Sequence, residues 1–247
     1  MADMDDLIDR HLRWQLEHAS SALRKSYEES DYAEITDFMP DCVHRLVLDE
    51  LESMFLSQAK RRDLIIRQSG NTPRKFSNLD RDTLRAGSRV LPSIFRSDAL
   101  ISLLEQIVGS PVHPVPYVPE EYIAARLHKA GDVHGWHWDD YTWALVWIFK
   151  MPDAENGGSV EYIKRVPWNR DDPRVGELVE AGPVIRRHPK VGSAYLLKAD
   201  TALHRVAPLT YDAERMMICF TFAGEDDLTR EVTHESMEAL FSASDAR

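Results

Sequence analysis

The chain has 247 residues, of which 43% are hydrophobic and 29% are charged, and its formal net charge is −11. This composition, without repeats or biased tracts, excludes a repeat array and a largely disordered chain. The acidic charge argues against nucleic acid as a partner, because phosphate backbones would be repelled, but it leaves room for a cationic small-molecule substrate.

Helical periodicity dominates the first 110 residues of the chain. Apolar residues recur at helical intervals in 5–27 and in 41–60, which predicts two amphipathic helices. A third helix is expected over 97–108, because Ser97 can cap its beginning and Gly109 can end it. We therefore expect a mainly helical N-terminal region.

After Pro111, short runs rich in Val, Ile, Tyr and Trp alternate with turn residues, which is typical of strands. Strands at this spacing predict a sandwich or jelly-roll barrel rather than alternating βαβ units. The expected strands cover 122–128, 142–149, 159–163, 184–187, 194–198 and 216–222. A last helix over 234–241 is expected to close one end.

No linker is visible, so we predict a single α+β domain over 1–247. Its helical region, residues 1–110, would pack on a strand-rich core, residues 111–233, and the C-terminal helix would lie in 234–247. The segment 166–183 is long, polar and charged, and it could form either a lid or the wall of a groove.

Three further features concern the environment of the chain. Cys42 and Cys219 lie far apart, without the spacing of a metal or redox pair, so we expect reduced thiols. The first residues lack the apolar core of a signal peptide. The most apolar stretch, 143–149, is too short to cross a membrane. We therefore expect a cytoplasmic protein; the sequence indicates no oligomeric state.

The segment His137-Trp138-Asp139 is the first candidate for chemistry. On its own it is weak evidence, because about one or two His-x-Asp/Glu matches arise by chance in such a chain. However, His204 follows 65 residues after Asp139 and can supply a second imidazole. Two imidazoles and a carboxylate are the set that holds Fe(II) on one face and leaves the other face open, as oxygenases require.

Arg215, eleven residues after His204, begins an expected strand. Near the iron, its guanidinium could hold the distal carboxylate of a dicarboxylic co-substrate through paired hydrogen bonds. In plainer alternatives, His204 is a hydrogen-bonded core histidine and Arg215 a surface salt-bridge partner. A zinc hydrolase could also use two histidines and an aspartate, but it would want a general base and would leave Arg215 unexplained.

From about residue 122 to 224 the chain resembles the Fe(II)/2-oxoglutarate-dependent dioxygenases. The motifs that carry the resemblance are Arg-Leu-x-x-x-Gly at 126–131, His-x-Asp at 137–139, a Gly-Gly turn at 157–158, His-Arg-Val-x-Pro at 204–208, and Arg215. The resemblance implies a double-stranded β-helix, with 2-oxoglutarate and O2 as co-substrates. It implies iron ligands His137, Asp139 and His204, and it implies that Arg215 binds 2-oxoglutarate. One residue more than is usual in prolyl-hydroxylase-type members separates His204 from Arg215.

The block 134–140 and the helical N-terminal region are similar to the small radical halogenases that chlorinate free lysine, and to their hydroxylating relatives. In the halogenases glycine replaces the carboxylate of the His-x-Asp motif, which frees a coordination position for chloride. Here Asp139 occupies that position. The resemblance therefore implies a hydroxylase that converts free L-lysine at C4 to hydroxylysine, with succinate and CO2 as co-products.

A free basic amino acid needs a cation for its α-carboxylate and carboxylates for its ammonium groups, because buried charges must be paired. The resemblance implies Arg74 and His134 for the carboxylate, and Glu120, Asp140 and Thr221 for the ammonium end. On the expected strand, Thr221 and Cys219 are separated from Arg215 by even numbers of residues, so all three share one face.

Each of these residues also has a plainer interpretation. Arg74 could lie in a solvated loop, Glu120 could merely begin a strand, Asp140 could cap a turn and His134 could orient a metal ligand. We expect an amide in the chlorinating relatives where Cys219 stands. We also expect them to have a tryptophan in the C-terminal helix, whereas the last one here is Trp168. What closes the pocket is therefore an open question at this point.

Other functions remain open. The oxygenase could act on a peptidyl or tRNA-bound residue or on another small molecule, it could be a halogenase, or the chain could be a sensor that retains metal without turnover. The acidic charge disfavours RNA. Lysine is not distinguished from ornithine or arginine, because a difference of one methylene is decided by side-chain positions.

Overall fold

The computed structural model describes residues 2–241. Its strands are β1 (Tyr32–Ile35), β2 (Lys60–Ile66), β3 (Thr72–Leu79), β4 (His113–Pro114), β5 (Tyr122–Leu127), β6 (Val133–His137), β7 (Trp143–Lys150), β8 (Val160–Ile163), β9 (Ile185–Arg187), β10 (Ala194–Lys198), β11 (Leu203–Val206) and β12 (Arg215–Ala223). Its α-helices are α1 (Ala2–His18), α2 (Ser20–Ser30), α3 (Asp41–Ser57), α4 (Arg81–Gly87), α5 (Leu91–Phe95), α6 (Asp98–Val108), α7 (Val175–Ala181) and α8 (Glu235–Phe241). Short 3₁₀ turns lie at η1 (Val118–Glu120), η2 (Ala154–Asn156) and η3 (Asp226–Leu228).

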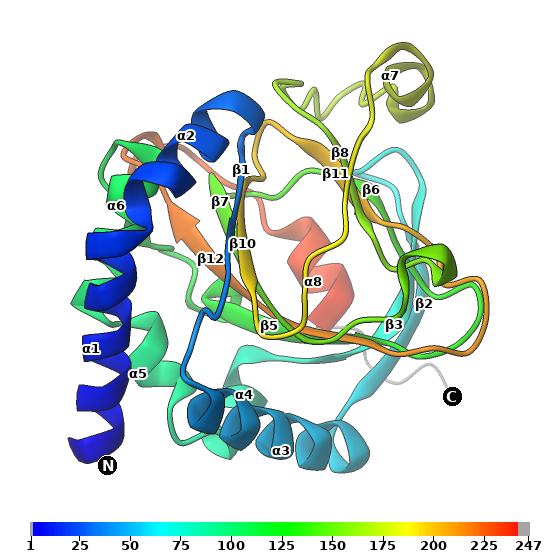
Figure 1. Ribbon diagram of the computed structural model, residues 1–247. Coiled ribbons are helices and arrows are strands. Elements are labelled where there is room, and N and C mark those ends of the chain that lie inside the picture. Colours follow the sequence, from blue (N-terminus) through cyan, green and yellow to red (C-terminus); the bar gives the residue numbers. More distant parts are fainter. Residues whose placement is uncertain (1, 242–247) are drawn as a thin grey trace.

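The strands form one curled antiparallel sheet in the order β1-β10-β7-β12-β5-β3-β6-β11-β8-β9, with β2 beside β3 and β4 beside β12. Strand β3 pairs with both β5 and β6, and so joins the two halves of the sheet. The halves curl toward each other, and α8 lies beside the curl (Figure 1). This arrangement is the double-stranded β-helix that the sequence predicted.

Strand β7 shows how the two faces of the sheet are buried. Trp143, Leu145 and Trp147 pack under the N-terminal helices, whereas Ala144 and Val146 face the interior of the curl. Successive side chains of a strand point to opposite faces, so a strand covered on both sides must be apolar throughout. The most apolar stretch of the chain is therefore a central strand, and no helix among residues 2–241 is long and apolar enough to span a membrane.

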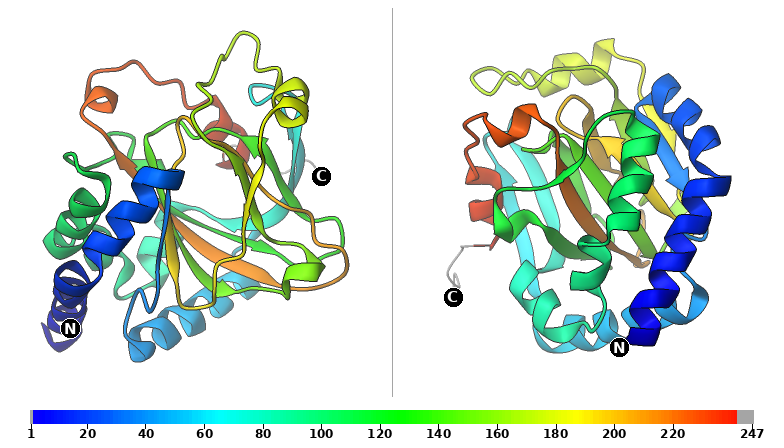
Figure 2. Two further views of the ribbon diagram at one scale, coloured as in Figure 1. Left: turned by 45° about the horizontal axis from the view of Figure 1, so that its top comes forward. Right: turned by 90° about the vertical axis from the view of Figure 1, so that its left-hand side faces the viewer.

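The N-terminal helices form a layer on one face of the sheet. Helices α1 and α2 both pack on α6, and α2 also packs on β1 (Figure 2). The apolar residues Leu12, Leu100 and Leu103 of this layer are fully buried in the same core as Trp147. Ser97 accepts a hydrogen bond from the backbone N–H of Leu100 and caps α6, as predicted.

The single helix expected over 5–27 is wrong, because the chain breaks at Ala19 into α1 and α2. A straight helix over 2–30 would be about 43 Å long, far longer than α6, on which both helices pack. The break allows both helices to pack on α6. The other two predicted helices are present as α3, which ends three residues early, and α6.

Although residues 1–110 were expected to be mainly helical, this region also contains β1, β2 and β3, which were not predicted. The sheet is therefore not confined to residues after 110, because β3 joins the two halves of the sheet. β3 was missed because it contains Pro73 and because much of its buried face is polar, including Arg74 and Asn78. Strand β4 was not predicted, and the strands expected to carry His137 and His204 were given no bounds, for a similar lack of apolar alternation; they are β6 and β11. Of the expected C-terminal segment, residues 242–247 lie outside the described residues.

Candidate metal centre and cavity

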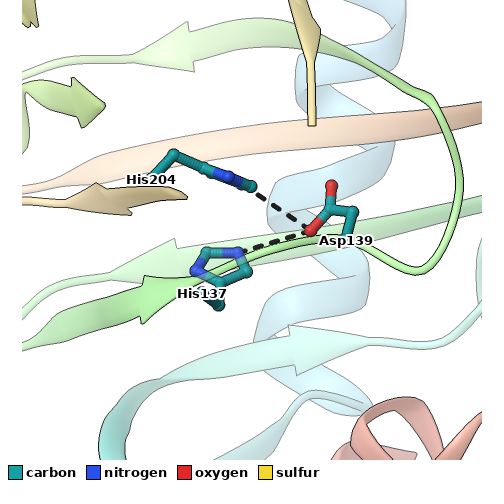
Figure 3. A group of neighbouring side chains, drawn as sticks. All are labelled: His137, Asp139 and His204. Carbon is teal, nitrogen blue, oxygen red and sulfur yellow. Dashed lines mark ion pairs between the residues drawn. The ribbon is translucent and has the colours of Figure 1, made fainter. Parts of the chain in front are cut away.

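The three proposed iron ligands meet between the two halves of the sheet. Strands β6 and β11 pair so that His137 lies opposite His204. Asp139 follows on the loop toward β7, where its backbone N–H donates to the carbonyl of Ala199 and its carboxylate points at both rings (Figure 3). Asp139 Oδ1 lies 3.5 Å from His137 Nε2 and 3.6 Å from His204 Nε2. Neighbouring ligands of an octahedral ion are roughly 3 Å apart, so small adjustments would let this set hold one.

Both imidazoles are oriented by the backbone. Nδ1 of His137 donates to the carbonyl of Gly135 at 2.7 Å, and Nδ1 of His204 donates to the carbonyl of Ala202 at 2.8 Å. The lone pair of each Nε2 is therefore directed toward the carboxylate of Asp139. A backbone carbonyl that fixes the tautomer in this way is a usual support of metal-binding histidines.

Burial sets the protonation of the centre. It lowers the pKa of His137 well below its usual range, and the positive charges of His134, His204 and Arg74 act in the same direction. Burial also raises the pKa of Asp139, although His204 opposes this shift. Neutral imidazoles are the form that binds metal, and a divalent cation would supply the charge that the buried carboxylate needs. The residues therefore fit an iron ion.

Arg215 begins β12 and is completely buried. Its guanidinium forms no ion pair among the described residues and no well-aligned hydrogen bond there, and the hydroxyl of Tyr195 is the neighbour with which it interacts. Gly158 lies beside it in a conformation with φ of 72°, and an added Cβ there would lie 3.4 Å from Cδ of Arg215. A buried cation without a partner is costly, so this geometry fits a site that an anion completes.

Tyr195, on β10, is a residue to which the sequence assigned no role. Burial raises the pKa of its hydroxyl to about 12, while the charge of Arg215 acts in the opposite direction. Tyr195 lines the same cavity as the three ligand candidates. The expected strand over 194–198 contained it, and the alternation of side chains between the two faces of a strand was the signal that could have placed it inward.

The proposed carboxylate-binding pair lies on neighbouring strands, because the register of β3 and β6 places Arg74 opposite His134. Arg74 is buried and donates to Thr72 Oγ1 and Ser69 Oγ, but its Nε has no partner among the described residues. Burial lowers its pKa to about 9. The solvated-loop interpretation of Arg74 is therefore wrong. The ring of His134 stacks on that of His137 at 4.1 Å between centroids.

The proposed ammonium-binding carboxylates approach the cavity from the opposite side. Glu120 ends η1, just before β5, and burial raises its pKa well above its usual range, with Asp140 and Asp139 acting in the same direction. Its Oε2 lies 3.9 Å from Nδ1 of His234, to which the sequence assigned no role. Asp140 is also buried, and it pairs with Arg170 rather than capping a turn.

One cavity brings the predicted residues together. It is lined by Arg74, Glu120, His134, Asp140 and Thr221 together with His137, Asp139 and His204. Cys219 and Thr221 face it from β12, as their spacing predicted, and Arg215 lies just beyond the lining. Helix α8 closes the cavity with Met237 and Leu240, in the helix where we expect the chlorinating relatives to have a tryptophan.

Comparisons with known proteins concern the family and the fold of the chain. The family model described as Halogenase D matches residues 16–242. No curated protein matches the chain. Among solved structures, the epimerase SnoN in complex with Fe3+, alpha ketoglutarate and nogalamycin RO is 16% identical, with 83% of this chain and 84% of that chain covered and a TM-score of 0.63.

Two prolyl hydroxylases are similar in fold. A prolyl 4-hydroxylase structure from Phytophthora capsici is 14% identical to this chain. The alignment covers 95% of this chain and 73% of that chain, with a TM-score of 0.60. The prolyl-4-hydroxylase of Pseudomonas putida is 14% identical, with 83% and 99% covered and a TM-score of 0.54. At such identities the likeness concerns the fold. The chain belongs to the Halogenase D family and is an enzyme with the fold of the iron- and 2-oxoglutarate-dependent oxygenases.

Proposed function

We propose that the protein is an Fe(II)- and 2-oxoglutarate-dependent hydroxylase of a free basic amino acid, with L-lysine as substrate and C4 as the position hydroxylated. The products would be hydroxylysine, succinate and CO2. The observation that carries the proposal is the complete ligand set, His137, Asp139 and His204, in a cavity with cationic and carboxylate side chains at separate places on its wall. Iron, when bound, supplies the oxidising chemistry with O2.

The buried Arg215 supports 2-oxoglutarate as the co-substrate. Its unpaired guanidinium can hold the distal carboxylate through two hydrogen bonds, and the hydroxyl of Tyr195 can donate a third. The other end of the same molecule would then reach toward the ligand set. Fixing the co-substrate at both ends is the contribution that the protein makes to this chemistry.

The remaining charges support a basic amino acid. Nε of Arg74 has no hydrogen-bond partner among the described residues and can meet an α-carboxylate, and Oε2 of Glu120, which lies 3.9 Å from His234 without a hydrogen bond, can meet an ammonium group. Both are buried, so a neutral or purely anionic substrate would leave a charge unpaired at considerable cost. Helix α8 covers the cavity, which favours a small molecule over a peptide.

Asp139 supports hydroxylation over halogenation. A carboxylate at this position takes the coordination site that chloride would need, once 2-oxoglutarate and oxygen take theirs.

We also place the enzyme in the cytoplasm, because its two cysteines are free, as a reducing compartment keeps them.

The test is a reaction of the purified enzyme with Fe(II), ascorbate and 2-oxoglutarate in chloride buffer, with each of the twenty free amino acids in turn. Mass spectrometry should show one added oxygen on lysine and an equal amount of succinate. Asp139→Ala should lose iron and lower this activity by more than about 100-fold, whereas Asp140→Asn should keep its iron. Chlorinated lysine would overturn the hydroxylase proposal. Turnover only with ornithine, arginine or a peptide would replace the substrate.

A further inference from the structure

Arg170, on the segment 164–174 between β8 and α7, is placed at the proposed substrate site by its contacts. Its Nη2 lies 2.5 Å from Oδ1 of Asp140, whose side chain is 4% exposed, whereas that of Arg170 is 35% exposed. Its Nη1 donates to Oγ1 of Thr233 at 3.3 Å, just before α8. One solvent-reaching side chain therefore connects the segment, a buried cavity carboxylate and the approach to α8.

Aromatic stacking fixes this segment beside the metal centre. The guanidinium of Arg170 lies 3.8 Å from the ring centroid of Trp168. Trp168 stacks in turn on Trp138, at 5.8 Å and an interplanar angle of 8°. Trp138 stands between His137 and Asp139 in the chain, and its Nε1 donates to the carbonyl of Val166 at 2.7 Å. Arg170 is thus held at Asp140 by the stacking of its guanidinium on Trp168 and of Trp168 on Trp138.

Arg170 also lies at the boundary between two cavities. The inner cavity is the one with the ligand set, and an outer cavity is lined by Arg170, Trp168 and Arg230. Asp139 and Asp140 line both. Arg230 donates to the backbone carbonyl of Asp140, not to its carboxylate. Among the described residues, Arg170 is the cation that is hydrogen-bonded to the Asp140 side chain.

We propose that Arg170 is a specificity-determining gate residue, which occupies at Asp140 the place that the side-chain ammonium group of the substrate takes when it binds. The inference rests on the proposed function for the identity of the substrate. An incoming ammonium replaces one ion pair by another, so the exchange costs little. A neutral side chain offers no such replacement and leaves Arg170 in place. Binding of a cation would release the segment 164–174 from Asp140.

The first measurement compares Arg170→Gln with Arg174→Gln in the iron- and 2-oxoglutarate-loaded enzyme without oxygen. Arg174 is a matched control, because it is on the same segment but pairs with the exposed Glu177. Calorimetry should show that Arg170→Gln binds L-lysine about three- to tenfold more tightly than wild type, because no resident cation competes. L-Norleucine, which lacks the terminal ammonium, should bind all three proteins equally. Weaker binding of both ligands to Arg170→Gln, or no change, would overturn the proposal.

The second measurement does not depend on the amino-acid substrate. Hydrogen–deuterium exchange of the segment 164–174 is followed with n-butylammonium chloride, with potassium chloride and with n-butanol. The ammonium ion alone should accelerate exchange in wild type and in Arg174→Gln, and Arg170→Gln should exchange fast from the start. Equal exchange in all conditions would contradict the gate. If wild type turns over no basic amino acid, the proposed function fails. The exchange measurement still decides whether Arg170 acts as a gate.

Discussion

At the scale of single residues, the protein buries two arginine side chains beside its cavity. Neither Arg74 nor Arg215 forms an ion pair among the described residues. Such buried charges lower the stability of the fold unless a ligand of opposite charge pairs with them. Their presence therefore indicates which chemical groups the cavity is built to receive.

Arg215→Met provides a test of this interpretation. The substitution removes a buried unpaired charge and keeps an unbranched side chain, so the free energy of unfolding should stay the same or rise. The KM for 2-oxoglutarate should increase by roughly 10- to 100-fold, since two charge-assisted hydrogen bonds are lost. Thermal unfolding and succinate formation measure the two effects. A large loss of stability with an unchanged KM would give Arg215 a structural role instead.

At the scale of elements, charged side chains connect strands that the sequence treated as separate. Asp132, in the turn before β6, accepts two hydrogen bonds from Arg61 on β2 and further ones from the backbone N–H groups of His128 and Lys129. Burial alone would raise the pKa of Asp132, but these hydrogen bonds outweigh it and lower the pKa below its usual value. The turn that leads to β6, the strand of the proposed ligand His137, is thus held by one carboxylate.

The lowered pKa predicts a pH dependence with a definite sign. Because the folded protein holds Asp132 ionised more firmly than the unfolded chain does, its contribution is present above the unfolded pKa of about 3.9 and is lost as pH falls through the lower folded pKa. At pH 7, Asp132→Asn should lower the free energy of unfolding by about 1–3 kcal/mol. In denaturant titrations the difference between the two proteins should begin to shrink as pH falls below about 4 and should vanish only below the folded pKa of Asp132. A difference that persists there would point to a cause other than ionisation.

At the scale of the whole molecule, the helical layer and the curled sheet share one core. Trp147 of β7 is fully buried against Phe38 and His44, which belong to the N-terminal region. No separate core under the helices is found among the described residues, since the helix residues belong to the cluster that includes β7 and β12. This supports the single domain expected from the sequence.

A shared core predicts a single cooperative unfolding transition. Circular dichroism, which reports the helices, and tryptophan fluorescence, to which the sheet contributes, should give the same midpoint. Trp147→Ala should lower the free energy of unfolding by about 3–5 kcal/mol and shift both signals together. Two midpoints, or a shift of only one signal, would mean that the N-terminal helices form a separate unit.

The sequence was informative where chemistry needs particular residue types at short spacing. His137 and Asp139, two residues apart, and the even spacing from Arg215 to Thr221 could be recognised locally. Strand β3 could not, because its polar inward residues serve the cavity rather than an apolar core. His234 and Arg170 were missed because each is defined by a partner far away in the chain, Glu120 and Asp140 respectively.

What the sequence determined by itself was therefore the fold class, and it also proposed the ligand set and the sign of the charges that the cavity needs. Local periodicity and residue chemistry carry that information. The tertiary structure decided that β3 joins the two halves of the sheet, that α8 closes the cavity and that Arg170 stands at Asp140. These depend on strand pairing and on contacts between distant segments, because a buried charge selects its partner by proximity in space and not by position along the chain.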